Sequence, residues 1–252
     1  EIVKQIIIKS DITTINERSF YGYNKLEQIS IPSSVTAIGD KVFKECTSLS
    51  LVNIPPLVET IGIGAFYGCV ALEEITIPPS VTSIRSGMLF LCNSLKKITI
   101  QSPLTVIKSY MFSGCSSLEE IIIPTSVTSI GDSCFSNCTS LKSLSIPRGV
   151  TSIGKGAFNE CKSLTQIDFD CLIESIEYQT FKDCTSLLQI EIPSSVKSID
   201  NEAFINCSSL NCVSIPSSVL NIGKNAFESC TSLTKIEIPS SITKIGSNCF
   251  GN

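Results

Sequence analysis

The sequence predicts a β-rich α/β solenoid of about eleven 23-residue units, with a parallel sheet on one face and short turns or 3₁₀ segments on the other. Two columns of residues that recur at this period indicate the fold. An isoleucine occupies one position of every unit from Ile15 to Ile245, and a phenylalanine occupies another, except where Leu89 replaces it. A fixed period through the chain indicates stacked units that contact only their neighbours. We therefore treat residues 1–252 as one domain, and expect it to be a fragment of a longer array or protein. The phenylalanines are Phe20, Phe43, Phe66, Phe112, Phe135, Phe158, Phe181, Phe204, Phe227 and Phe250.

Each unit opens with a short strand and then a proline. In residues 118–140 the run Leu-x-x-Ile-x-Ile alternates apolar and polar residues, which predicts a strand with Ile121 and Ile123 directed into the core. Proline follows in most units, and its missing N–H ends ladder pairing. The Val-Thr-Ser-Ile segment that comes next is also β-like, so a second, shorter ladder is compatible with the pattern.

The second half of each unit is predicted to be a turn. A glycine column at Gly39, Gly62, Gly131, Gly154, Gly223 and Gly246 follows the isoleucine, and we expect glycine there because it tolerates the φ values of turns. The Ala-Phe-x-x-Cys stretch predicts one helical or 3₁₀ turn whose phenylalanine fills the interior. Three units depart from the pattern, where we expect a bend or a local feature. Their unusual residues are Arg85 and Leu89, then Gln101 and Lys108, then Phe169, Asp170 and Glu177.

Thirteen cysteines raise the question of disulfides, but nine of them form one more column. A free cysteine packs as a small hydrophobic side chain, so we expect buried thiols rather than a disulfide framework. Cys134 and Cys249 take the place of alanine in other units, whereas Cys171 and Cys212 fall at positions that predict exposed thiols. The column is Cys46, Cys69, Cys92, Cys115, Cys138, Cys161, Cys184, Cys207 and Cys230.

Composition excludes several classes of function. The formal net charge of -4, with no run of like charges, argues against a nucleic-acid partner. No apolar stretch approaches the ~20 residues of a membrane span. Histidine is absent, so Ser-His-Asp and Cys-His catalysis are excluded within the chain, and no Gly-rich phosphate loop is present. We therefore predict a protein that is not an enzyme, with no cofactor and no metal site.

The repeat Leu-x-x-Ile-x-Ile-Pro-x-Ser-Val-x-x-Ile-Gly-x-x-Ala-Phe-x-x-Cys-x-Ser resembles the BspA-like class of leucine-rich repeats over essentially the whole chain. The resemblance implies a leucine-rich repeat array with a parallel sheet on one face, used for protein recognition. It also implies a cell-surface or secreted protein of bacterial or protozoan type that adheres to host or matrix proteins. It implies no catalytic residue.

A partner surface is predicted on the strand face, because the residue between the two inward isoleucines points outward. This outward column is small and polar, and it turns acidic toward the C-terminal half, which would suit a basic partner. The alternative is that Ser and Thr simply suit exposed strands. The candidate contacts in the column are Thr76, Thr99, Ile122, Ser145, Asp168, Glu191 and Glu237.

A second candidate surface surrounds Phe90 and Leu91, which are displaced next to Leu89. Phe90 shares a column with Tyr21 and Tyr67, and contiguous exposed apolar residues often mark interfaces. The alternative is a register shift that buries Phe90 in place of Leu89, and the sequence does not separate the two.

Three functions remain open. The leading prediction is a protein-binding module of a surface or secreted protein, the second is an intracellular scaffold, which abundant thiols without a disulfide framework would suit, and the third is a structural spacer. We also expect association between copies of the chain through uncapped ends of the array.

Overall fold

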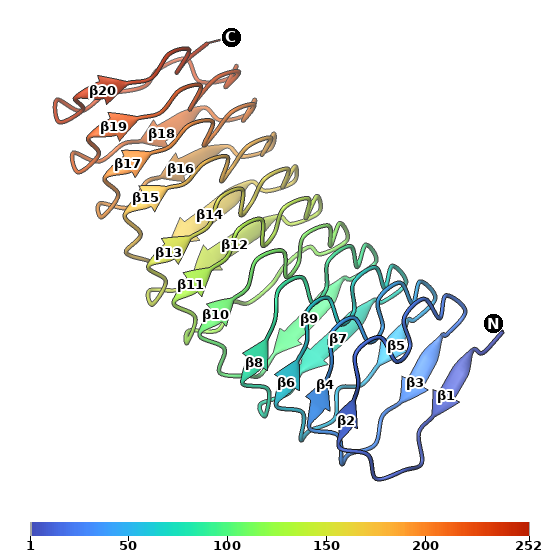
Figure 1. The fold of residues 1–252 in the computed structure, drawn as a ribbon. Helices are drawn as coiled ribbons and strands as arrows, with labels where there is room; N and C mark the ends of the chain where they lie inside the picture. Colours follow the sequence, from blue (N-terminus) through green and yellow to red (C-terminus); the bar gives the residue numbers. More distant parts are fainter. Residues whose placement is uncertain (1, 252) are drawn as a thin grey trace.

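The computed structural model describes residues 2–251 as a long, twisted rod of stacked turns, with the two termini at opposite ends (Figure 1). Two columns of parallel strands run along the rod. Paired residues lie 23 positions apart, as in Gln5 with Gln28 and Ile15 with Ile38. Each turn of the chain therefore returns to the same place, which confirms the predicted parallel solenoid and its short second ladder.

The first column holds the longer strands, and we call it the long-strand column. Its strands belong to four separate sheets, which are β1-β3-β5, β7-β9, β12-β14 and β16-β18. The strands are β1 (Gln5–Ile7), β3 (Gln28–Ser30), β5 (Leu51–Val52), β7 (Glu74–Ile77), β9 (Lys97–Ile100), β12 (Ser143–Ile146), β14 (Gln166–Phe169), β16 (Gln189–Glu191) and β18 (Cys212–Ser214).

The short-strand column runs beside it, and each of its strands has two residues (Figure 1). It forms three sheets, which are β2-β4-β6-β8, β10-β11-β13 and β15-β17-β19-β20. The strands are β2 (Thr14–Ile15), β4 (Ala37–Ile38), β6 (Thr60–Ile61), β8 (Ser83–Ile84), β10 (Val106–Ile107), β11 (Ser129–Ile130), β13 (Ser152–Ile153), β15 (Ser175–Ile176), β17 (Ser198–Ile199), β19 (Asn221–Ile222) and β20 (Lys244–Ile245).

The turn that carries the phenylalanine is not helical. Residues 2–251 contain no helix, so the helical part of the predicted α/β solenoid is wrong. The backbone instead bonds forward to the next turn, as in Phe43 N–H to the Ala65 carbonyl at 2.8 Å. It also visits the left-handed region twice per turn, for example at Lys41 (φ 55°) and Glu45 (φ 62°). A helix does not form here because alternate N–H groups donate to carbonyl groups of the neighbouring turn and not to carbonyl groups of their own turn.

The phenylalanine column is a continuous stack inside the rod, except at Leu89. Phe181 and Phe204 lie 5.2 Å apart between ring centroids with 5° between their planes, and their neighbours repeat this geometry. Leu89 is fully buried at the missing place. A register shift that buries Phe90 instead is therefore excluded, and Phe90 is only partly buried.

The glycine column is required by space, not by φ as the sequence suggested. Gly131, Gly154 and Gly223 lie outside the positive-φ region. A Cβ atom on Gly223 would lie 2.4 Å from the Asn201 backbone nitrogen, and one on Gly131 would lie 2.4 Å from the Ser109 nitrogen. Successive turns approach each other so closely here that no side chain fits between them.

Two turns that lack both the proline and the glycine interrupt the short-strand column. It opens between β8 and β10, where Gln101 and Lys108 stand, and between β13 and β15, where Asp170 and Glu177 stand. Arg85 replaces the glycine alone, and its N–H still bonds the Ile61 carbonyl at 3.0 Å. The loss of both residues, rather than of the glycine alone, thus accompanies the break.

The long-strand column opens on the opposite side of the same two turns. It is unpaired after β9 and again between β14 and β16. A turn that separates from its predecessor along one column and from its successor along the other is tilted relative to both. The column also opens between β5 and β7. None of the three units that depart from the repeat pattern explains this third opening.

Replacement of Gly223 by alanine is expected to lower the free energy of unfolding by about 1–3 kcal/mol, because the new Cβ displaces backbone and not a flexible side chain. Urea unfolding measures the effect. The matched control is Gly251→Ala, where the nearest atoms lie at an ordinary contact distance of 3.4 Å or more. Equal stability of the two variants would contradict the close approach of the turns.

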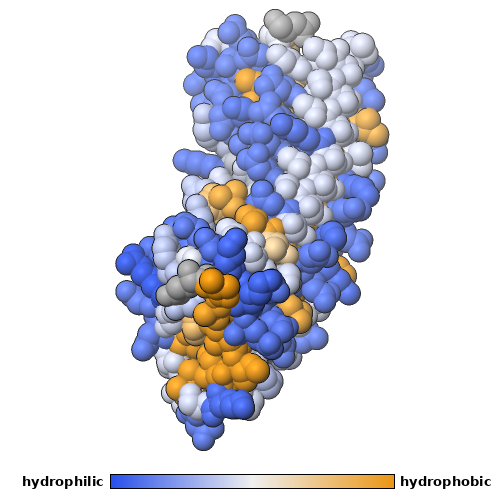
Figure 2. All heavy atoms as spheres, turned by 90° about the vertical axis from the view of Figure 1, so that its right-hand side faces the viewer, coloured by the Kyte–Doolittle hydropathy of each residue, from blue (hydrophilic) through white to orange (hydrophobic). Residues whose placement is uncertain are grey.

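The first and last turns leave the edge of the core partly uncovered. Apolar side chains gather at the N-terminal end, seen low in Figure 2, where Ile2 and Ile7 are exposed and Phe20 is half-buried. At the other end Phe250 stacks on Phe227 and remains 39% exposed. Within residues 2–251 there is no long apolar helix of the kind that crosses a membrane.

Candidate functional site

The predicted contact residues lie together on the outer face of the long-strand column. Ile75 and Ile77 are buried on either side of the exposed Thr76, and this alternation confirms the predicted inward and outward directions. Thr99 is half-buried. The remaining candidates, which are Ile122, Ser145, Asp168, Glu191 and Glu237, are exposed.

Residues 119–123 occupy a strand position in the long-strand column but join no sheet. In the described part of the chain they pair with neither β9 before them nor β12 after them. One backbone bond remains at the margin, from Lys142 N–H to the Glu119 carbonyl at 3.1 Å. The neighbouring turn at 97–108 is the first of the two tilted turns, so the opening follows from the loss of Pro and Gly there.

A groove of about 910 Å³ lies over this opening, which we call the Ile122 groove. Ile98, Ile121 and Leu144 form its buried floor. Ile122 lines the groove and is 88% exposed. This exposure is unusual for a large apolar residue, because its side chain is not buried against the rest of the chain. Unpaired backbone groups of 119–123 add polar edges to the groove.

Ion pairs between successive turns flank the Ile122 groove. Lys96 Nζ lies 3.0 Å from Glu73, and Lys142 Nζ lies 2.5 Å from Glu119. The hydrogen bond and charge of Lys142 lower the pKa of the exposed Glu119 carboxyl. Pairs this exposed contribute little to stability. They do leave charges of both signs beside an apolar side chain, an arrangement that suits a protein surface as partner.

Two of the three acidic residues toward the C-terminal half contact a neighbour on their own strand position. Gln166 Nε2 donates to Asp168 at 2.7 Å, and Lys235 Nζ lies 3.0 Å from Glu237. Only Glu191, on β16, stands without such a contact among the described residues. Among the described residues, the one cation paired with these three carboxylates is therefore Lys235, at Glu237.

Tyr67, Phe90 and Leu91 form a second surface on the turn side of the rod. The Phe90 ring packs against Tyr67 with centroids 5.0 Å apart, and Leu91 is 37% exposed with φ 60°. Sequence reasoning missed Tyr110, which comes from another column and lies 6.1 Å from Phe90. Its contact depends on how two turns stack, which no spacing of 23 residues reveals.

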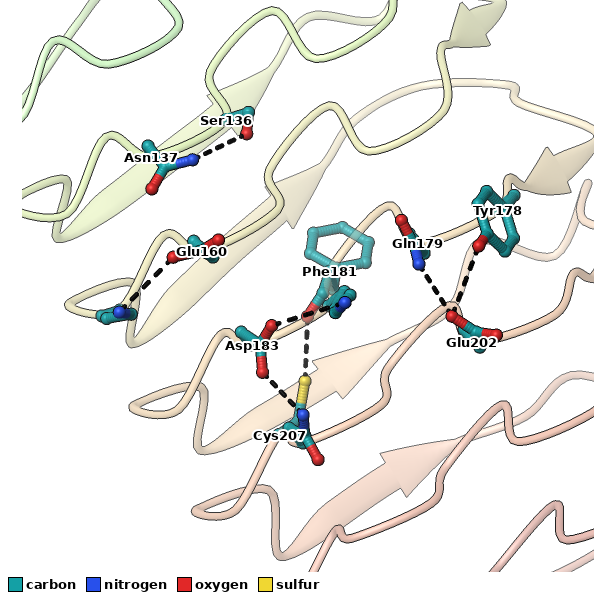
Figure 3. A network of polar contacts seen from close by, with 12 residues as sticks. Ser136, Asn137, Glu160, Tyr178, Gln179, Phe181, Asp183, Glu202 and Cys207 are labelled. Atoms are coloured by element: carbon teal, nitrogen blue, oxygen red, sulfur yellow. Dashed lines mark hydrogen bonds and ion pairs between the residues drawn. The ribbon is translucent and has the colours of Figure 1, made fainter.

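The cysteine column is buried as predicted, and each thiol donates a hydrogen bond to a backbone carbonyl of the preceding turn. Cys207 Sγ donates to the Phe181 carbonyl at 3.1 Å, and the other eight column cysteines repeat this bond at 3.1–3.4 Å (Figure 3). Burial raises the pKa of Cys46 and of Cys161 to about 12. Such thiols are poor nucleophiles at neutral pH.

The two predicted exposed thiols differ. Cys212, on β18, is exposed, whereas Cys171 is only 6% exposed, so that prediction is wrong. Cys171 lies in one of the two turns that lack both the proline and the glycine, and Ser102, at the equivalent place of the other such turn, is also buried. Within residues 2–251 no group of three or more Cys, Asp or Glu side chains is placed to hold a metal ion.

Polar side chains also tie neighbouring turns together on the turn side of the C-terminal half. Glu202 accepts hydrogen bonds from Gln179 at 2.7 Å and from Tyr178 at 3.4 Å (Figure 3). Asp183 accepts one from Asn206 at 2.7 Å. These contacts join residues 23 or 24 positions apart, so their evident role is to align adjacent turns.

The chain is similar to leucine-rich repeat proteins of bacteria. The family model described as "BspA type Leucine rich repeat region (6 copies)" matches residues 2–119 and 128–252. A leucine-rich repeat protein from Bacteroides ovatus is 32% identical with a TM-score of 0.64, and the alignment covers 99% of this chain and 76% of that one. No curated protein matches the chain.

Two further solved structures are similar to the chain. A leucine rich cell surface protein from Faecalibacterium prausnitzii is 30% identical with a TM-score of 0.72, over 99% of this chain and 79% of that one. A leucine-rich repeat protein from Eubacterium ventriosum shares the fold at 24% identity, with a TM-score of 0.62 over 99% and 82% of the two chains. From its repeats, its stacked turns and these matches, the chain belongs to the BspA type leucine-rich repeat family.

Proposed function

We propose that this chain is a protein-binding module of a surface or secreted protein of the adhesin type, and that the Ile122 groove is its main contact. The observation that carries the proposal is Ile122 itself, 88% exposed within a groove of about 910 Å³. Burial of such a side chain in a partner would contribute about 1.5–3 kcal/mol.

The composition around the Ile122 groove favours a protein over a small molecule. An apolar centre surrounded by charges of both signs has the layout of a binding hot spot with a polar rim. The partner we propose is a host or matrix protein that inserts an apolar residue beside Ile122 and places charges against Lys97 and Glu120. No covalent chemistry is required, and we propose no enzymatic role.

The surface location rests on the family and on one relative. The Faecalibacterium prausnitzii protein is described as a cell surface protein, and its fold extends over nearly all of this chain. An intracellular scaffold or a spacer would use the same fold, and binding to matrix proteins distinguishes the proposed role from both. Association of copies through the apolar ends of the rod stays a prediction. Measurement of the molecular mass by analytical ultracentrifugation would test it.

The proposal is tested by surface plasmon resonance on immobilised fibronectin, fibrinogen and laminin. We expect the wild-type chain to bind at least one of them, and Ile122→Ser to weaken that binding about tenfold or more, because the central apolar contact is lost. The exposed position of Ile122 predicts no loss of thermal stability in the variant.

The matched control is Leu172→Ser, which removes a side chain that is 62% exposed and lies outside the Ile122 groove. It should bind as the wild type does. Absence of binding to all three proteins, or equal affinity of the Ile122→Ser and wild-type chains, would remove the groove from the proposed function.

A further inference from the structure

A line of aromatic rings runs along the turn side of the rod at the N-terminal half, and we call it the aromatic strip. It consists of Tyr21, Lys44, Tyr67, Phe90 and Tyr110. Lys44 Nζ lies 5.7 Å from the Tyr21 ring centroid and 4.3 Å from that of Tyr67. Phe90 then joins Tyr67 and Tyr110 at 5.0 and 6.1 Å. The strip thus crosses five successive turns without a break.

Most of the strip is one column, since Tyr21, Lys44, Tyr67 and Phe90 each come one residue after a core position. Leu89 fills that core position beside Phe90, and Phe90 is half-buried against Tyr67 and Tyr110. Tyr110 is 48% exposed at a left-handed backbone position, with φ 60°. Aromatic area of this kind is costly to leave in water unless something covers it.

A pocket of about 480 Å³ adjoins the end of the strip at Phe90, Leu91 and Tyr110. Its other walls are neutral and rich in hydroxyl and amide groups, including Asn93, Ser113 and Asn137. Among the described residues that line it, none is charged. Ser113, which lines the pocket, is only 6% exposed.

Two of the residues that line the pocket, Leu91 and Gly114, lie in close contact. A Cβ atom on Gly114 would lie 2.6 Å from Leu91 Cδ2, so only glycine lets Leu91 lie down over the next turn. Gly114 itself has φ 77°, which also favours glycine. This wall of the pocket is therefore formed by two residues at consecutive places of one column.

We propose that the aromatic strip and its adjoining pocket bind a neutral carbohydrate chain. A pyranose ring presents an apolar C–H face, which stacks on an aromatic ring, and an edge of hydroxyl groups, which exchange hydrogen bonds with Ser, Thr and Asn. The aromatic rings of the strip could stack on such a C–H face, and the hydroxyl and amide groups of the adjoining pocket could bond such an edge. Anionic ligands fit it poorly, since the cation of the strip, Lys44, already contacts two rings and lies 3.6 Å from Glu45.

This site lies on the turn side and is separate from the Ile122 groove, so either proposal can fail alone. The test is isothermal titration calorimetry and saturation-transfer NMR with cellohexaose, laminarihexaose, mannohexaose and chitohexaose. Tyrosine fluorescence gives an independent signal, because the chain has 5 tyrosines and no tryptophan, and three of those tyrosines are in the strip. We expect at least one oligosaccharide to bind and to change that fluorescence.

Tyr110→Ala should weaken the binding about five- to tenfold, the loss of one aromatic contact. Tyr178→Ala is the matched control, because Tyr178 is 37% exposed on the C-terminal half and outside the pocket. It should leave the affinity unchanged. Failure of all four oligosaccharides to bind at millimolar concentration overturns the proposal, as does an equal loss in both variants. Binding of an oligoproline peptide alone would overturn it in favour of a peptide site.

Discussion

The free energy of unfolding is expected to fall steeply as the pH rises from about 9 toward about 12, because the folded chain holds its thiols protonated. Burial raises the pKa of Cys46, Cys115 and Cys161 from 9.0 to about 12, and raises those of Cys69 and Cys184 as well. The unfolded chain loses these protons first. The stabilisation is therefore complete below the unfolded value and is lost as the pH rises through the folded value.

The effect should be large because it recurs in every turn. One thiol that is protonated only in the folded state contributes at most about 1.4 kcal/mol per pH unit. Urea unfolding midpoints at successive pH values measure the sum. Replacement of Cys115 and Cys161 by alanine should flatten the pH dependence, even though each replacement also lowers stability at pH 8.

Thiol labelling supplies the control for this alkaline transition. At about pH 8 a thiol reagent should modify Cys212 in the folded protein, while the twelve buried cysteines react only after unfolding. A midpoint that stays constant across the alkaline range, or rapid labelling of the column in the folded state, would contradict the buried-thiol account.

The second large effect is expected at the centre of the phenylalanine stack. Phe158 is fully buried between Phe135 at 5.6 Å and Phe181 at 5.4 Å. Phe158→Ala should lower the free energy of unfolding by about 3–5 kcal/mol, since the cavity lies between two rigid rings that cannot collapse into it. Chemical unfolding followed by circular dichroism measures the loss.

Phe90→Ala is the comparison that gives this prediction its meaning. Phe90 lies one residue from the core position but is only half-buried, so its replacement should cost about 1 kcal/mol, much less than that of Phe158. Similar costs for the two variants would mean that Phe90 has a core role and would weaken the case for a binding surface there. A small cost for Phe158→Ala would contradict the stack as a main source of stability.

The columns of the repeat could be predicted because each position meets its own copy one turn away. Ile38 pairs in register with Ile15 in the preceding turn and with Ile61 in the following turn. A side chain at this position must therefore pack against two copies of itself, so the same residue type recurs in every turn. The same logic placed the nine thiols in the interior. Where a residue contacts mainly the equivalent residues of neighbouring turns, its surroundings can be predicted from the 23-residue period of the sequence.

The failures came where a contact joins different columns or where a turn tilts. The glycines looked like turn residues, but a Cβ on Gly154 would lie 2.5 Å from the Asp132 nitrogen, a constraint between turns that leaves no mark in local φ preferences. Cys171 was expected at the surface and is buried, as is Ser102 at the equivalent place of the other turn that lacks both Pro and Gly. The turn after each glycine looked helical, yet its N–H groups bond the next turn.

The sequence by itself determined the period, the membership of the core columns and the family, because these depend on contacts between equivalent residues of successive turns. Only the tertiary structure decided where the strand ladder opens, that Ile122 stands over a groove, and that Tyr110 completes a strip with Phe90. These features depend on how two unlike turns settle against each other. The tilt that results is a property of their combined packing, and no single unit contains it.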